Sequence, residues 1–181
     1  MKIIRRVARA VTNAAKDIKV IVTDVDGVLT DGTVRIDEEG RESFAQFNIL
    51  DGFAVTIAND CDLKIIVISG RKSLCTEARC SKLGITEVYT GIRDKAAKLN
   101  EVIQRLELNT SQVAYIGDDL LDLSAMSLAR LKIAPKNAVD FVKQQVDYIT
   151  KASGGGGVFR EVVELVLKAQ GRYASYMQRY I

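Results

Sequence analysis

Short apolar runs recur along the chain, and longer segments with apolar residues at helical spacing separate them. A β-branched run such as residues 18–23 is long enough to form a buried strand. Segments of about ten or more residues between such runs predict helices that carry the chain back to pair the next strand in parallel. The predicted strands are residues 18–23, 63–68, 87–90, 113–116, 132–134 and 148–150.

The predicted helices alternate with these strands. They cover residues 50–59, 73–83, 93–106, 120–128, 139–144 and 158–170. Two extended stretches, 33–37 and 41–47, flank the polar turn Glu38-Glu39-Gly40 and predict a β-hairpin. The expected fold class is therefore α/β, a parallel sheet between two layers of helices.

One domain accounts for the pattern, because 181 residues is a usual size for a single domain. We expect this domain at 18–171, a lead-in helix at 1–17 and a C-terminal tail at 172–181. For residues 1–17 we favour a short amphipathic lead-in helix over a helix bound to a membrane surface. Four glycines at 154–157 precede the last helix and predict a loop that approaches a ligand or a neighbouring chain.

Composition excludes several classes of function. The chain has no histidine, which excludes a Ser-His-Asp or Cys-His nucleophile and histidine-bound zinc. A net charge of +3 and 6% aromatic residues give no basis for nucleic-acid binding. The odd number of cysteines (Cys61, Cys75 and Cys80) indicates a reducing compartment rather than a disulfide framework. Without a signal peptide or a spanning segment, we expect a cytoplasmic protein with no membrane partner.

Polar side chains follow the predicted strands at the points where the strands end. In an open α/β sheet, ligands bind at the carboxyl ends of the strands, so these side chains are expected to converge on one edge. They are Asp24 and Asp26 after the first strand, Ser69 and Arg71 on either side of Gly70 after the second, Lys95 at the start of a helix, and Asp118, Asp119 and Asp122 after residues 113–116.

This set of residue types favours phosphoryl transfer. Asp24 and Asp26 lie two residues apart, and close carboxylates are tolerated when a cation sits between them. A carboxylate-rich pocket without histidine suits Mg²⁺. A carboxylate nucleophile, a metal, a lysine and a hydroxyl together suit a reaction through an aspartyl-phosphate. Each short motif is weak alone, and their order along the chain carries the prediction.

In that order, the motifs resemble those of the haloacid dehalogenase (HAD) superfamily of phosphatases with an aspartate nucleophile. Residues 24–27 are similar to its first motif, Ser69 to its second, Lys95 to its third and residues 117–122 to its fourth. This resemblance implies a three-layer Rossmann-like HAD fold with a parallel sheet, a protruding β-hairpin and no large cap domain.

Within that superfamily the chain looks like the capless 3-deoxy-D-manno-octulosonate 8-phosphate (KDO 8-phosphate) phosphatases, over about residues 18–171. The resemblance implies Mg²⁺-dependent hydrolysis of KDO 8-phosphate to KDO and phosphate, in lipopolysaccharide precursor synthesis. The motifs that carry it are DVDGVLTDG at 24–32, Phe47-Asn48 with Asp51-Gly52, SGRK at 69–72, Arg79-Cys80, YIGDDLL at 115–121, and Gly154-Gly155 with Arg160-Glu161.

The resemblance also implies roles for the matching residues. Asp24 would attack phosphorus, and Asp26 would protonate the leaving alkoxide and then activate water. The carboxylates of Asp24 and Asp118, with the main-chain carbonyl of Asp26, would hold Mg²⁺. Ser69 and Lys95 would bind the phosphoryl oxygens.

Further roles concern the surroundings of the phosphate. Asp119 and Asp122 would orient Lys95 and the waters on the metal. The hairpin at 33–47 would build a homotetramer and cover a neighbour's site, and the tail could reach into an adjacent subunit. The residues implied to contact substrate outside the reacting centre are Asn48, Asp51, Gly52, Gly70, Arg71 and Arg79.

Three positions depart from the family pattern where the sugar is bound. Leu50, Thr56 and Gly156 stand where basic residues are usual in such enzymes. A desolvated sugar carboxylate needs a compensating charge, and we expect Arg71 and Arg79 to provide it.

These departures leave two alternatives open. One is a phosphatase for a sialic-type nine-carbon sugar acid 9-phosphate. The other is a non-catalytic HAD-like binding subunit, against which the intact Asp24, Asp26, Lys95 and Asp118 argue.

Overall fold

A six-stranded parallel sheet forms the centre of the molecule in the computed structural model, which describes residues 2–181 and, within them, the side chains of 9–42 and 44–181. The strand order is β5-β4-β1-β6-β7-β8, and all six strands predicted from the sequence are confirmed. Their bounds are β1 (Val20–Thr23), β4 (Lys64–Ile68), β5 (Glu87–Tyr89), β6 (Val113–Ile116), β7 (Leu131–Ala134) and β8 (Tyr148–Ile149).

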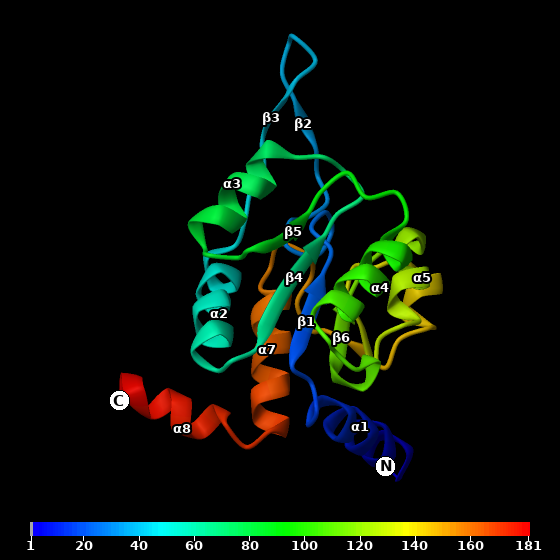
Figure 1. The fold of residues 1–181 in the computed structure, drawn as a ribbon, viewed down its shortest axis with the longest axis vertical. Helices are drawn as coiled ribbons and strands as arrows, with labels where there is room; N and C mark the ends of the chain where they lie inside the picture. Colours follow the sequence, from blue (N-terminus) through cyan, green and yellow to red (C-terminus); the bar gives the residue numbers. More distant parts are fainter. Residues whose placement is uncertain (1) are drawn as a thin grey trace.

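Helices cover both faces of the sheet, which confirms the predicted α/β fold (Figure 1). Side chains of β1 alternate between the two cores, with Ile21 on one face and Val20 and Val22 on the other. The core with Ile21 includes residues of α1 (Lys2–Ala15), α2 (Ile49–Asp60), α3 (Leu74–Lys82), α7 (Val158–Ala169) and α8 (Tyr173–Met177). The core with Val20 includes residues of α4 (Lys95–Arg105), α5 (Leu123–Met126) and α6 (Asp140–Lys143). Met1, part of the predicted lead-in helix, lies outside the described residues.

The prediction of an α-helix at 120–128 is wrong for its first three residues. A 3₁₀ turn at Leu120–Asp122 precedes the short helix α5. The side chain of Asp119 accepts a hydrogen bond from the Leu120 N–H at 2.7 Å, and the Asp122 carboxylate accepts from the Asp118 N–H at 3.1 Å. Aspartate side chains that bind nearby main-chain N–H groups compete with the helical pattern, which is the reason for the break.

The hairpin projects from one end of the molecule, away from both termini (Figure 1). Its strands, β2 (Arg35–Ile36) and β3 (Glu42–Phe44), are antiparallel and shorter than predicted, with a shift of register between them. Three of its apolar side chains are exposed, by 40% for Val34, 65% for Ile36 and 47% for Phe44.

The predicted tail is folded in this chain. It forms α8 and a 3₁₀ turn at Gln178–Tyr180. Tyr176 is buried and its hydroxyl donates to the Asp60 carboxylate at 3.0 Å, while the rings of Tyr180 and Phe53 meet edge to face. Aromatic side chains that find both apolar cover and a hydroxyl partner on α2 explain why these residues dock on their own chain. Among residues 2–181, no helix combines the length and hydrophobicity needed to cross a membrane.

The glycine run at 154–157 approaches another loop of the same chain. A Cβ at Gly154 would collide with the carbonyl of Gly27, and the Gly155 N–H donates to the Val28 carbonyl at 3.0 Å. The glycines therefore support the loop after β1, which carries the candidate catalytic residues.

Candidate active site

A cleft of about 540 Å³ opens at the carboxyl edge of the sheet. It lies where β1, β4 and β6 end and α4 begins, the edge at which the sequence predicts convergence. The candidate site residues that line this cleft are Asp24, Asp26, Gly70, Arg71, Lys95, Asp118, Asp119 and Asp122.

Lys95 is the buried cation of the cleft. It is the first residue of α4, whose N-cap is Asp94, and it is only 3% exposed. Its Nζ lies 3.0 Å from Asp24 Oδ2 and 2.8 Å from Asp122 Oδ1. Burial acts to lower the pKa of Lys95, but the two carboxylates outweigh it and the pKa lies above its ordinary value. The lysine is therefore a fixed positive charge beside Asp24.

Asp122 is fully buried and its oxygens are occupied. Oδ1 accepts from Lys95 Nζ and, at 3.0 Å, from the Tyr115 hydroxyl. Oδ2 accepts from the main-chain N–H groups of Asp118 at 3.1 Å and Asp119 at 3.4 Å. Because both oxygens already accept hydrogen bonds, we assign Asp122 to holding Lys95 and the Asp118 loop in place.

Unlike Asp122, Asp24 and Asp118 have carboxylate oxygens that can still bind a ligand. Asp24 Oδ1 is buried and has no hydrogen-bond partner among the described residues. Burial and the negative charge of Asp122 raise the pKa of Asp24 to about 7, against the lowering effect of Lys95. Burial, with Asp122 and Asp119, also raises the pKa of Asp118 to about 7. Two carboxylates held near each other in this way are stabilised in the charged form by a cation.

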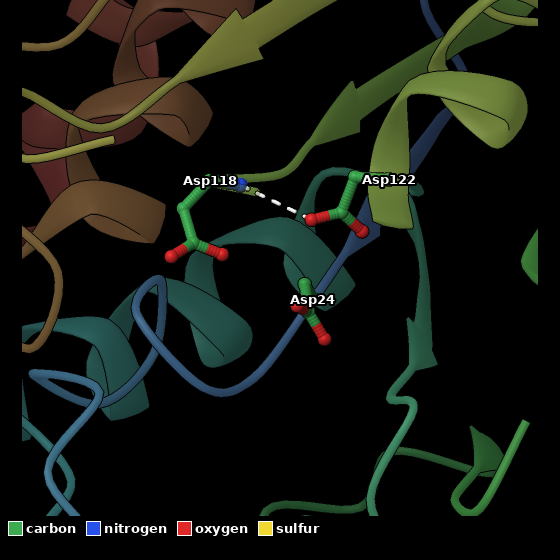
Figure 2. Close-up of side chains that lie close together, drawn as sticks. All are labelled: Asp24, Asp118 and Asp122. Atoms are coloured by element: carbon green, nitrogen blue, oxygen red, sulfur yellow. Dashed lines mark hydrogen bonds between the residues drawn. The ribbon is translucent and has the colours of Figure 1, made fainter. Parts of the chain in front are cut away.

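The carboxylates fit a divalent metal ion. Asp24, Asp118 and Asp122 each offer one oxygen, and these atoms lie within 4.8 Å of one another (Figure 2). Five aspartates line the cleft against three cationic side chains, so it carries surplus negative charge when the aspartates are ionised. Carboxylate oxygens are the ligands that Mg²⁺ prefers. Since Asp122 is occupied by other donors, Asp24 and Asp118 are the side chains best placed to bind the ion; the carbonyl ligand of Asp26 stays a prediction.

Asp26 lies at the side of the cleft that faces the hairpin. Its Oδ2 accepts from Arg71 Nε at 3.1 Å, and the same guanidinium holds Glu42 of β3 with Nη1 and Nη2, both at 3.0 Å. Ser69 is buried, and its Oγ both accepts from the Arg71 N–H and donates to the Arg71 carbonyl, at 3.3 Å each. Arg71 thus joins the candidate acid–base residue to the hairpin.

Four of the predicted substrate-binding residues lie elsewhere, around a second cavity of about 20 Å³ between α2, α3 and α7. The Asn48 side chain caps α2 at the Leu50 N–H, 2.8 Å away, and Arg79 packs over the space where Gly52 lacks a side chain. Asp51 is buried and accepts from the Arg160 N–H at 2.9 Å. Burial raises the pKa of Asp51 to about 6, although N–H groups at the start of α7 act to lower it. A role for these residues in binding substrate stays a prediction.

Two residues of this region have no role assigned from the sequence: Tyr115, although it begins the YIGDDLL motif, and Arg93. Tyr115 looks like a core residue of β6, yet its hydroxyl holds Asp122. The signal for Tyr115 was a hydroxyl within a strand of otherwise aliphatic residues, because the hydroxyl of a buried tyrosine normally needs a hydrogen-bond partner. Arg93 lines the cleft two residues before Lys95 and has no motif around it.

Comparison with known proteins places the chain in a family. Residues 61–162 match the family described as haloacid dehalogenase-like hydrolase. A 3-deoxy-D-manno-octulosonate 8-phosphate phosphatase from Escherichia coli K12 is 38% identical over 158 residues, which is 87% of this chain and 84% of the relative.

Two solved structures have the same fold. The phosphatase of that name from Moraxella catarrhalis, in complex with magnesium, phosphate and KDO, superposes with a TM-score of 0.91 at 35% identity, over 94% of this chain and 98% of that one. The cobalt-bound enzyme from Haemophilus influenzae gives a TM-score of 0.86 at 35% identity, over 90% and 95% of the two chains. The resemblance predicted from the sequence is confirmed, and the chain belongs to the haloacid dehalogenase-like hydrolase family.

Proposed function

We propose that this chain is a Mg²⁺-dependent phosphatase that hydrolyses KDO 8-phosphate to KDO and phosphate through an aspartyl-phosphate. The observation that carries the proposal is Asp24: one oxygen is held by Lys95, and the other is buried without a partner among the described residues. A carboxylate in this state is oriented but not saturated, which suits a nucleophile. Relatives named for this substrate, similar over most of the chain, support the choice of sugar.

In the first half of the reaction, a carboxylate oxygen of Asp24 attacks phosphorus. The bond from phosphorus to the sugar oxygen breaks as the bond to Asp24 forms. Asp26 gives its proton to the leaving alkoxide, which departs as a sugar hydroxyl. Lys95 and Ser69 bind the phosphoryl oxygens, for which Ser69 must exchange its main-chain contacts with Arg71.

In the second half, Asp26 takes a proton from water and the resulting hydroxide attacks the phosphorus of the aspartyl-phosphate. The bond to Asp24 breaks, phosphate leaves and both aspartates return to their starting state. When bound at Asp24 and Asp118, Mg²⁺ supplies positive charge that offsets the carboxylates and the phosphoryl group. Asp122 keeps Lys95 in place throughout, through the contact at 2.8 Å.

A phosphatase for a nine-carbon sialic-type sugar acid 9-phosphate is the second candidate. The observation in its favour is the absence of charge at Leu50, Thr56 and Gly156, which the family resemblance places near the sugar. A non-catalytic binding subunit is disfavoured, because such a subunit has no need of the buried ion pairs of Lys95.

Release of inorganic phosphate from a panel of substrates tests the proposal. The panel contains KDO 8-phosphate, the nine-carbon 9-phosphate and an aryl phosphate, each with Mg²⁺ and with excess chelator. We expect turnover of KDO 8-phosphate to exceed the other two and to require the metal. A higher specificity for the nine-carbon acid would favour the second candidate, and no Mg²⁺-dependent turnover of any substrate would favour the binding subunit.

We also propose that the enzyme acts in the cytoplasm as a homotetramer assembled through the hairpin. The exposed Val34, Ile36 and Phe44 support assembly, because an isolated two-stranded ribbon with an apolar face is marginal in water. The free cysteines, two of them buried, fit a reducing compartment.

A further inference from the structure

Three cationic side chains line the catalytic cleft, and two of them are committed to carboxylates of this chain. Lys95 holds Asp24 and Asp122. Arg71 holds Asp26 with Nε and Glu42 with both terminal nitrogens. The third is Arg93, which is exposed and has no ion pair or hydrogen bond to any side chain that the structure describes.

Of the two arginines that the sequence favours for the sugar carboxylate, Arg71 is paired in the cleft and Arg79 lies outside it. Arg79 lies over Gly52 at the second cavity. Three further arginines are paired with carboxylates outside the cleft: Arg160 with Glu164, Arg172 with Asp62 and Arg179 with Asp60. Among the side chains that the structure describes, Arg93 is therefore the arginine of this cleft that is left without a carboxylate partner.

The main chain at Arg93 is held in place although its side chain is unpaired. The Ile92 N–H donates to the Ser69 carbonyl at 3.0 Å, which fixes the loop to the end of β4. On the other side, Asp94 caps α4 by accepting from the Ala97 N–H at 2.9 Å. Asp94 is thereby occupied as a helix cap, and Arg93 projects from a loop that is anchored on both sides.

We propose that Arg93 binds the carboxylate of the sugar acid and so determines specificity for acidic sugar phosphates. An arginine is always protonated in proteins and matches a carboxylate with two parallel N–H donors. This role replaces the one that the sequence favours for Arg71 and Arg79. The inference rests on the proposed function, because a substrate without a carboxylate gives Arg93 nothing to bind.

Arg93→Ala tests the inference by comparing kcat/KM on two substrates. We expect kcat/KM for KDO 8-phosphate to fall by about tenfold to a hundredfold. For an aryl phosphate, which has no carboxylate, we expect a change of less than about twofold. Free KDO should inhibit aryl phosphate hydrolysis about tenfold less well in the variant, while inhibition by inorganic phosphate stays the same.

Two further variants control the experiment. Arg93→Lys keeps the charge but not the paired donors, so it should recover part of the loss. Arg130→Ala removes an exposed arginine that precedes β7 at the opposite edge of the sheet, and all rates should stay at wild-type values.

The outcomes separate this inference from the proposed function. Equal losses on both substrates would assign Arg93 to the phosphate, and no loss on either would remove it from the site; both results overturn the inference alone. A wild-type enzyme that hydrolyses aryl phosphate but no sugar-acid phosphate would overturn the proposed function, and the inference with it.

Discussion

The cleft and the hairpin lie next to each other but are built in opposite ways. In the cleft, Lys95 and Asp122 are buried, and they contact each other, Asp24 and the Tyr115 hydroxyl. In the hairpin, Ile36 and Phe44 are 65% and 47% exposed, and the paired strands contain only two and three residues. The proposed catalytic charges are therefore held by buried contacts within the chain, whereas the hairpin leaves apolar side chains exposed.

Asp24→Asn should give the largest effect on the cleft side of this comparison. The change removes the attacking carboxylate and preserves its shape, so we expect turnover to fall by at least about a thousandfold. Lys95 keeps Asp122 as a partner, so the fold should persist. Steady-state kinetics and a thermal melt measure the two effects.

The matched control is Asp62→Asn, a change at an exposed aspartate that precedes β4 at the opposite edge of the sheet. Asp62 has a positive φ of 50°, a conformation that asparagine also adopts readily. Its turnover should match the wild type. Near-normal turnover of Asp24→Asn itself would contradict the aspartyl-phosphate mechanism.

Asp122→Ala tests whether the cleft depends on its buried network. Removing one partner of a buried ion pair commonly costs about 3–5 kcal/mol, and we expect a value near 3 kcal/mol because Lys95 retains Asp24. Tyr115→Phe removes a single hydrogen bond to the same carboxylate and should cost about 1 kcal/mol. Urea unfolding measures both. Equal costs for the two variants would show that Asp122 is not the centre of the network.

The sequence was sufficient to predict the sheet and the edge at which the charges meet. Apolar runs mark the strands, and the rule that parallel strands place their carboxyl ends together gives the neighbours of Asp24 without further information. The sequence was insufficient where a side chain binds the main chain of its own loop. Asp122 accepts a hydrogen bond from the Asp118 N–H, and the predicted helix 120–128 begins instead with a 3₁₀ turn.

Tertiary contacts also determine how the predicted tail and Asp51 pack, which the sequence did not predict. Tyr176 docks because α2 offers Asp60 beside an apolar surface, a pairing of residues more than a hundred positions apart. Asp51 faces the start of α7 for a similar reason, since its partner Arg160 is distant in the chain. No local pattern encodes contacts of this kind.

Ile36→Lys tests the hairpin side of the comparison. A charge at an exposed apolar position should not disturb the fold of a single chain, but it should prevent burial of that position between copies. We expect light scattering at micromolar concentration to show a homotetramer for the wild type and smaller species for the variant. Glu38→Lys, at the exposed hairpin turn, is the matched control and should leave the assembly intact. A monomeric wild type would contradict the proposed role of the hairpin.

The smallest expected effect is the pH dependence of stabilisation by Mg²⁺, and it probes the charge balance of the cleft directly. Burial raises the pKa values of Asp24 and Asp118 to about 7, above the ordinary value of 3.8. A carboxyl group whose pKa is raised on folding stabilises the folded state fully at a pH below about 4. This contribution is lost as the pH rises through about 7. The free energy of unfolding of the metal-free protein should therefore fall over that interval.

Mg²⁺ should restore the lost stability because it binds the ionised carboxylates. Between pH 5.5 and 8, the gain in Tm on adding Mg²⁺ should therefore grow. Ionising one carboxylate with a pKa of about 7 costs about 2 kcal/mol at pH 5.5, which corresponds to roughly 4–8 °C in Tm for a chain of this size. Asp118→Asn removes one ligand and one titrating group, so most of the gain and of its pH dependence should disappear. A gain in Tm that is the same at both pH values would place Mg²⁺ away from these two aspartates and would leave the surplus negative charge of the cleft without a cation to offset it.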